Sequence, residues 1–135
     1  MSNSGRCYCG AVRYESEGDP AMKGQCHCRE CQYISGGDVH HFMAVPEAGF
    51  KYTQGSPNSF TRSDLENPVT REFCGNCGTH LTTKVPAFAG IVILKVGTLD
   101  DPSVYGMPEM AIFTCDKQAF QLVPDGIPTF DKGPG

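Results

Sequence analysis

The chain has 135 residues, 16 glycines, 10 prolines, no tryptophan and a formal net charge of −4. Its length predicts one domain, residues 1–135, whose modest core a bound metal would help to stabilise. The acidic charge argues against sequence-independent nucleic-acid binding, and no apolar run approaches the roughly 20 residues of a membrane span.

Short apolar segments separated by turns predict a mainly β fold, a single domain of short antiparallel strands. In chain order, strands are expected over residues 11–16, 23–26, 41–45, 50–54, 59–62, 70–74, 80–84, 91–96, 110–114 and 120–123, and one helical turn over 29–34. The segments 50–54 and 59–62 are expected to pair around a turn at 55–58. The segments 70–74 and 80–84 are expected to form a hairpin with cysteines at its tip.

Seven of the eight cysteines fall into three clusters, and only Cys115 stands alone. The clusters are Cys7-x-Cys9, Cys26-x-Cys28-x-x-Cys31 and Cys74-x-x-Cys77. Pairs this close in sequence crowd the thiols too much for four relaxed long-range disulfides. Residues 1–20 are polar and charged and lack an apolar signal segment. We therefore expect metal-bound thiolates in a reducing compartment, which predicts a cytoplasmic protein.

Seven thiolates divide naturally into four and three, and zinc sites come in these two kinds. A closed structural zinc takes four ligands, whereas a catalytic zinc takes three protein ligands and keeps one position open. Spacing alone does not fix which clusters combine. The economical solution joins Cys7, Cys9, Cys74 and Cys77 in a structural site. It leaves a three-thiolate site of Cys26, Cys28 and Cys31, whose open position can hold water or a thiol deprotonated by the metal.

In the alternative interpretation the middle cluster is also a closed structural site. Its fourth ligand would then be His27, His40, His41, His80 or Cys115. His27 lies between two ligands and is expected to point away from the ion that they share. Cys115 is expected to pack as a small buried apolar residue. A fourth protein ligand would make the site inert, so its presence or absence separates the two interpretations.

The order of the clusters resembles the glutathione-dependent formaldehyde-activating enzyme family, which is related to centromere protein V. The motifs that carry the resemblance are Gly5-x-Cys7-x-Cys9-Gly10-Ala11-Val12, Cys26-His27-Cys28-x-x-Cys31, Ser35-Gly36, Phe73-Cys74-x-x-Cys77-Gly78-Thr79 and Gly126-Ile127-Pro128-x-Phe130-Asp131-x-Gly133-Pro134. They run through nearly the whole chain.

The resemblance implies a zinc-dependent β-rich fold similar to that of a Rab-GTPase chaperone. It implies two zinc ions, one structural on the first and third clusters and one catalytic on the middle cluster. The implied activity is that of a carbon–sulfur lyase, which joins formaldehyde to glutathione as S-hydroxymethylglutathione. The implied partners are therefore glutathione or a similar thiol and a small aldehyde, with no nucleic acid and no membrane.

The sequence departs from the family pattern at two positions. Many members have arginine where Gln32 stands, and a positive charge there could balance the three-thiolate site. Many members have tryptophan where Phe120 stands, and the phenylalanine is expected to keep an aromatic plug.

We expect an enzyme in which a zinc-held thiol sulfur is the nucleophile and Arg29 or His27 orients the carboxylates of the thiol. The alternative is a non-catalytic, zinc-stabilised protein-binding module. Chromatin association is disfavoured by the acidic charge and by the lack of a basic tail.

Overall fold

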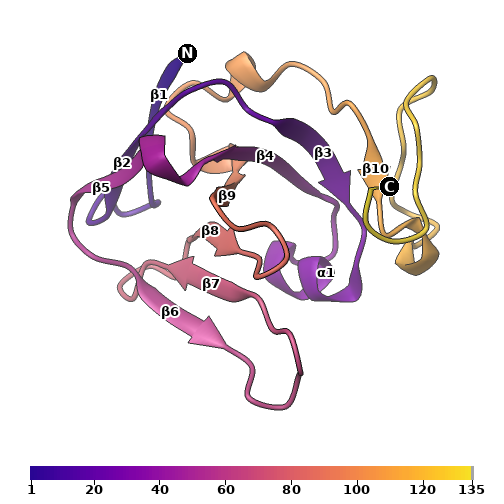
Figure 1. Cartoon of the computed structure of the whole chain (residues 1–135), viewed down its shortest axis with the longest axis horizontal. Helices are drawn as coiled ribbons and strands as arrows, with labels where there is room; N and C mark the ends of the chain where they lie inside the picture. The colour runs from indigo at the N-terminus through magenta and orange to yellow at the C-terminus, as the bar shows by residue number, and fades with distance from the viewer. Residues whose placement is uncertain (135) are drawn as a thin grey trace.

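Two β-sheets and one short helix build the protein, which is described here by a computed structural model over residues 1–134 (Figure 1). The smaller sheet has the strand order β1–β2–β5 and is antiparallel. Its strands are β1 (Ser2–Arg6), β2 (Arg13–Glu17) and β5 (Phe50–Gln54). The prediction of a mainly β fold is confirmed. The strand β1 was not expected from the sequence.

The larger sheet has seven strands in the order β10–β3–β4–β9–β8–β7–β6. They are β3 (Met22–Cys26), β4 (His40–Pro46), β6 (Asn58–Thr61), β7 (Thr70–Phe73), β8 (His80–Lys84), β9 (Ile91–Lys95) and β10 (Ala111–Ile112). The helix α1 (Arg29–Ser35) follows β3, and short 3₁₀ turns cover Glu47–Gly49, Val96–Thr98, Pro102–Tyr105 and Thr114–Asp116. The sheet is antiparallel except that β10 pairs with β3 in parallel, a departure from the antiparallel fold that we expected.

The expected pairing of 50–54 with 59–62 is wrong. β5 pairs with β2 of the smaller sheet, whereas β6 pairs with β7 at the edge of the larger sheet. The difference follows from burial. Phe50 stacks on Tyr14 with ring centroids 5.3 Å apart, which holds β5 against the core. All four residues of β6 are exposed. The turn at 55–58 therefore carries the chain from one sheet to the other.

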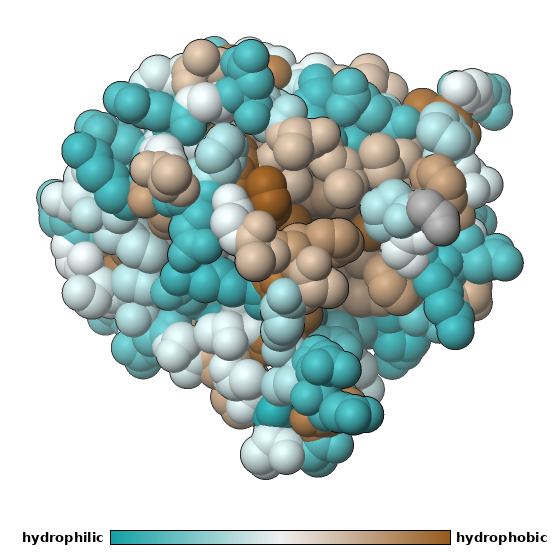
Figure 2. Space-filling view, in the orientation of Figure 1, coloured by the Kyte–Doolittle hydropathy of each residue, from teal (hydrophilic) through white to brown (hydrophobic). Residues whose placement is uncertain are grey.

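The side chains of β4 and β9 alternate between two apolar cores, because successive strand residues point to opposite faces. Met43 and Leu94 pack in the first core, together with Tyr14 of the smaller sheet. Phe42 and Ile93 pack in the second core, which includes cysteines of the middle cluster. Fully burying a side chain such as Leu94 contributes roughly 1.5–3 kcal/mol. Figure 2 shows that apolar side chains gather in the middle of this view, over β3, β4 and β9.

Strand register places a row of polar and sulfur side chains on one face of the larger sheet. Cys26 lies opposite His40 on the neighbouring strand, and Phe42 lies opposite Lys95. Ile93, on the same face as Lys95, lies opposite Thr83, which in turn lies opposite Arg71. We call the face that carries Cys26, His40, Lys95, Thr83 and Arg71 the site face. The helix α1 packs against β4 beside it.

The C-terminal tail is irregular, and it borders β10. Phe130 N donates to the carbonyl oxygen of Ala111 at 2.9 Å, and Ala111 N donates to the carbonyl oxygen of Pro128 at 3.0 Å. The segment 120–123, expected as a strand, forms none. Phe120 is 68% exposed, so the expected aromatic plug is wrong. Among residues 1–134, no helix has the length and apolar character needed to cross a membrane.

Candidate metal centres

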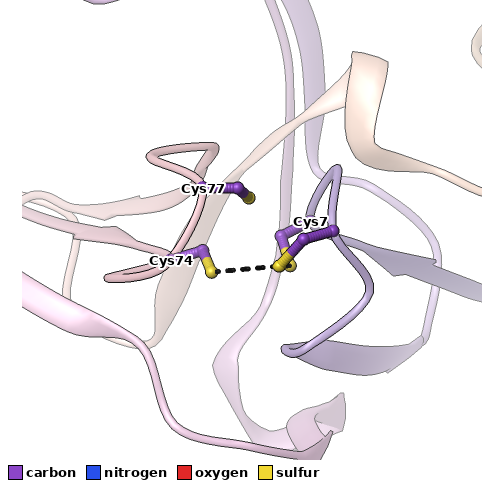
Figure 3. A group of neighbouring side chains, drawn as sticks. Cys7, Cys74 and Cys77 are labelled. Carbon is purple, nitrogen blue, oxygen red and sulfur yellow. Dashed lines mark hydrogen bonds between the residues drawn. The ribbon is translucent and has the colours of Figure 1, made fainter.

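The first and third cysteine clusters meet, as the sequence predicted. The Sγ atoms of Cys7, Cys9, Cys74 and Cys77 all lie within 4.8 Å of one another. The first pair comes from the turn between β1 and β2, and the second from the tip of the β7–β8 hairpin (Figure 3). The Cys7–Cys9 and Cys9–Cys74 sulfur distances are 3.7 and 3.8 Å. Tetrahedral ligands at about 2.3 Å from zinc are about 3.8 Å apart, so the donor set fits zinc.

Hydrogen-bond donors surround these four sulfurs. Val12 N donates to Cys7 Sγ at 3.3 Å, and the side-chain amide of Asn76 donates to Cys9 Sγ at 3.3 Å. The Thr79 hydroxyl lies 3.2 Å from Cys77 Sγ. The hydrogen bonds from Thr79 lower the pKa of Cys77 to about 5. Donors of this kind favour the thiolate form that a metal requires.

The three cysteines of the middle cluster also meet, and we call them the cysteine trio. Cys26 ends β3, Cys28 is the N-cap of α1, and Cys31 lies in the first turn of the helix. Their Sγ atoms lie within 4.8 Å of one another. Cys31 N donates to Cys28 Sγ at 3.3 Å, so the N-cap contact itself orients one sulfur. Cys26 and Cys31 are buried while Cys28 is half-buried, so the trio reaches solvent on the Cys28 side.

The trio concentrates negative charge on one sulfur. Hydrogen bonds from Cys26 and Cys31 lower the pKa of Cys28 to about 2, and the backbone N–H of Cys31 and the charge of Arg71 act in the same direction. The same contacts raise the pKa of the Cys26 thiol. Three thiols at this separation cannot all ionise without a cation, because like charges oppose one another. A divalent metal would satisfy all three.

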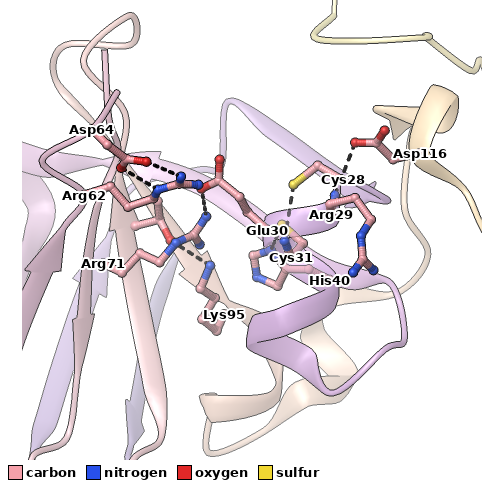
Figure 4. Close-up of polar contacts among 11 residues, drawn as sticks. Cys28, Arg29, Glu30, Cys31, His40, Arg62, Asp64, Arg71, Lys95 and Asp116 are labelled. Carbon is pink, nitrogen blue, oxygen red and sulfur yellow. Dashed lines mark hydrogen bonds and ion pairs between the residues drawn. The ribbon is translucent and has the colours of Figure 1, made fainter. Parts of the chain in front are cut away.

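Within residues 1–134, no fourth histidine or cysteine completes the trio. His40 comes nearest, with Nδ1 at 3.7 Å from Cys31 Sγ (Figure 4). No nitrogen of His40 lies within 4.8 Å of all three sulfurs, as a fourth tetrahedral ligand would. Nδ1 of His40 instead contacts Cys31, and its buried Nε2 has no hydrogen-bond partner among the described residues. Burial, and then the charge of Lys95, hold the pKa of His40 well below its usual value.

Several other predictions about single residues are settled by burial. His27 points away from the trio, as expected, and its two ring nitrogens lie 3.2 Å from the Oε1 atoms of Gln25 and Gln121. It is fully buried, so a role in orienting a substrate carboxylate is wrong. Cys115 is exposed, which contradicts the expected burial. It lies two residues after Phe113, whose φ of 56° redirects the chain into a 3₁₀ turn with no buried residue.

Gln32 has a structural role at the position where many family members have arginine. It is 4% exposed, and its Nε2 donates to the carbonyl oxygens of His27 at 2.9 Å and Asp116 at 3.0 Å. Arg29 donates to Gln32 Oε1 within α1 and lies over the ring of Tyr33, and its expected role in orienting a substrate carboxylate stays a prediction. The positive charge beside the trio comes from elsewhere. Lys95, which the sequence reasoning missed, is 7% exposed and lies on the site face.

A groove of about 200 Å³ lies between α1 and the β6–β7 hairpin. Arg71 and Glu30 line it and form an ion pair at 3.0 Å, and Glu30 falls between Cys28 and Cys31 in the helix (Figure 4). Phe60, which is 59% exposed, contributes to an apolar wall. A groove with this mixture of groups beside the trio suits a small molecule that has both an anionic and an apolar part.

Comparison with known proteins agrees with this geometry. The family model for the glutathione-dependent formaldehyde-activating enzyme matches residues 2–116. The chain belongs to the glutathione-dependent formaldehyde-activating enzyme family. A search of curated proteins gave no match.

Among solved structures, a Rhodobacter sphaeroides protein determined in a structural genomics programme has a similar fold. Its crystal structure matches with a TM-score of 0.63 and 17% identity, over 93% of this chain and 98% of that chain. Identity at this level shows the fold alone. For this member of the formaldehyde-activating family, the features established are therefore the family, a mainly β fold, and two cysteine clusters that could hold metal ions.

Proposed function

We propose that this protein is a zinc-dependent carbon–sulfur lyase that joins a small aldehyde to a thiol such as glutathione, or removes it. The observation that carries the proposal is the trio itself. Three sulfurs are in ligand geometry, no fourth protein ligand lies among the described residues, and Cys28 opens toward solvent. Family membership supports the choice of thiol and aldehyde. We also propose a cytoplasmic location, which the eight free thiols support.

In the proposed reaction the thiol loses its proton, its sulfur attacks the carbonyl carbon, and the carbonyl oxygen gains a proton. The product is a hydroxymethyl thioether, and the reverse steps release the aldehyde. A zinc ion on Cys26, Cys28 and Cys31 would lower the pKa of the incoming thiol, so that thiolate forms near neutral pH. The three thiolate donors help to keep the bound sulfur nucleophilic.

Residues around the trio hold it and receive the rest of the thiol. Contact with His40 Nδ1 at 3.7 Å positions Cys31 Sγ. Arg71 has five N–H donors, and its ion pair with Glu30 is through one nitrogen. We infer that the remaining donors of Arg71 bind a substrate carboxylate in the groove. The second, closed site of Cys7, Cys9, Cys74 and Cys77 has a structural role in this proposal.

The direct test is calorimetric titration of the zinc-loaded protein with glutathione. We expect saturable binding at one site per chain, with release of a proton when the thiol ionises. S-methylglutathione is the matched control ligand, because it keeps every group except the free thiol, and it should bind at least tenfold more weakly than glutathione. A titration with no saturable glutathione binding would falsify the lyase proposal.

Arg71→Gln is expected to weaken glutathione binding by about 10- to 100-fold, the range that follows from losing a hydrogen bond to a charged group, about 1.5–3 kcal/mol. Binding of 2-mercaptoethanol, which has no carboxylate, should change much less. Arg62→Gln is the control variant, because Arg62 lines the groove but pairs with Asp64 at 2.6 Å at its rim. Equal losses for both thiols would show that Arg71 does not bind the carboxylate.

The alternative proposal is a zinc-stabilised binding module, similar in role to the Rab chaperone whose fold the family is expected to share. The contact of His40 with Cys31 is the observation that favours it, since a small shift would close the site. This alternative requires that His40→Ala release one zinc ion per chain. In the lyase proposal the variant keeps both ions.

A further inference from the structure

Lys95 is a buried cation without a carboxylate partner. It ends β9, it is 7% exposed, and its Nζ donates to Thr83 Oγ1 at 2.7 Å. An ammonium group has three donors. The ion pairs among residues 1–134 do not include Lys95. Burying an unpaired charge is costly, so a buried lysine in a native protein needs a compensating negative charge.

The compensating charge available to Lys95 is the cysteine trio. Strand register puts Lys95 on the same face as Cys26 and His40, and Figure 4 shows it next to Arg71. The nearest carboxylate on α1, Glu30, is already paired with Arg71. Burial lowers the pKa of Lys95 to about 8, while negative charge on Cys31, Cys26 and Cys28 acts in the opposite direction.

The charges balance when the trio holds a divalent metal. Three thiolates and one Zn²⁺ carry a net charge of −1, and the Lys95 ammonium brings the buried site to neutrality. The imidazoles of His40 and His80 are weaker candidates for this role, because an ordinary histidine side chain carries little charge at neutral pH whereas a lysine ammonium is charged. Gln32 cannot take it, since its amide is uncharged and bonded to the backbone.

We propose that Lys95 is the charge partner of the metal-bound cysteine trio, and that it makes the open position selective for an anionic fourth ligand. The ligand class follows from the charge. A bound thiolate takes the net charge of the zinc ion and its four sulfurs to −2. The Lys95 ammonium offsets part of the repulsion between these negative charges. A neutral ligand such as imidazole gains nothing from the lysine. The part that concerns the fourth ligand rests on the proposed function, whereas the part that concerns the metal stands independently.

The test replaces Lys95 with methionine, which keeps the buried stem and removes the charge. Zinc affinity is measured by competition with a chromophoric chelator, and ligand affinity by the visible spectrum of the cobalt-substituted protein. We expect Lys95→Met to weaken zinc at the trio and glutathione binding at least tenfold each, and imidazole binding less than twofold. Lys95→Arg should recover most of both losses. Lys84→Met, on the exposed end of β8, is the matched control.

A lysine with a merely structural role predicts a different outcome. In the Cys28→Ser background the trio cannot hold its metal, so removing the unpaired ammonium should leave the melting temperature unchanged or raise it. The proposal is overturned by two results together. Lys95→Met would lower stability in the Cys28→Ser background, and the single variant Lys95→Met would bind zinc as tightly as the wild type. If Lys95→Met does not fold, the zinc and glutathione affinities of Lys95→Gln and Lys95→Arg are compared instead, because these two variants also differ in charge.

The two proposals fail in different ways. If the wild-type protein binds no thiol but Lys95→Met still loses zinc, the lyase proposal fails and the charge partner stands. If the wild type binds glutathione and Lys95→Met binds zinc and glutathione equally well, the charge partner fails and the lyase proposal stands.

Discussion

Cys74→Ser is expected to abolish the four-cysteine metal site and to destabilise the whole protein. Cys74 is 1% exposed, and its site ties the turn after β1 to the tip of the β7–β8 hairpin. Structural zinc binding is worth roughly 10–16 kcal/mol in small zinc-finger peptides, against a net stability of about 5–15 kcal/mol for a typical domain. Losing one ligand should therefore remove several kcal/mol, seen as a large fall in melting temperature and one zinc ion fewer per chain.

Cys115→Ser is the control for this experiment, because Cys115 is exposed and belongs to neither metal cluster. It should bind both ions and melt as the wild type does. A Cys74→Ser protein that unfolds at the wild-type temperature would show that this site does not hold the two parts of the chain together.

Cys28→Ser is expected to have the opposite profile, with the fold kept and the chemistry lost. Cys28 is half-buried at the start of α1, and serine is itself a favoured N-cap residue. The helix should therefore survive, while the trio keeps two thiolates and loses its metal. We expect one zinc ion per chain by elemental analysis and glutathione binding weakened beyond detection by calorimetry. The melting temperature should fall less than in Cys74→Ser, with the remaining fall due to the loss of the charge partner of Lys95.

Zinc counts for the two variants separate the two metal sites. Both variants lose one ion, but Cys74→Ser should lose much more stability than Cys28→Ser. If Cys28→Ser unfolds as readily as Cys74→Ser, the trio is a structural site. If it keeps both zinc ions and binds glutathione normally, Cys28 is not a ligand.

Local sequence spacing predicted the metal clusters better than it predicted the strand pairing. Cys-x-Cys and Cys-x-x-Cys bring two sulfurs together within one turn, whatever the rest of the chain does. Pairing between strands depends on where a distant apolar face lies. The segment 50–54 pairs with β2 because Phe50 and Tyr52 contact the core, and nothing within the 55–58 turn encodes that choice.

Lys95 was missed from the sequence, and Cys115 and Phe120 were misplaced, for the same reason, which is that their surroundings depend on distant parts of the chain. Lys95 follows the apolar run 91–94 and looks like the solvated end of a strand. Only the register of β3, β4 and β9 places it on the same face as Cys26. Its one signal in the sequence was its position two residues after Ile93, because alternate residues of a strand share a face. Cys115 and Phe120 were misplaced because their burial depends on the irregular path of the tail.

The parallel pairing of β10 with β3 makes the C-terminal tail part of the support of the metal centre. Ile112 lies beside Cys26, and the backbone of Ala111 is bonded to the tail at Pro128 and Phe130. The family model matches residues 2–116, so the tail residues that bond to β10 lie beyond the matched segment. We therefore expect relatives that differ only in their last twenty or so residues to differ in how firmly they hold the cysteine trio, with all seven clustered cysteines unchanged.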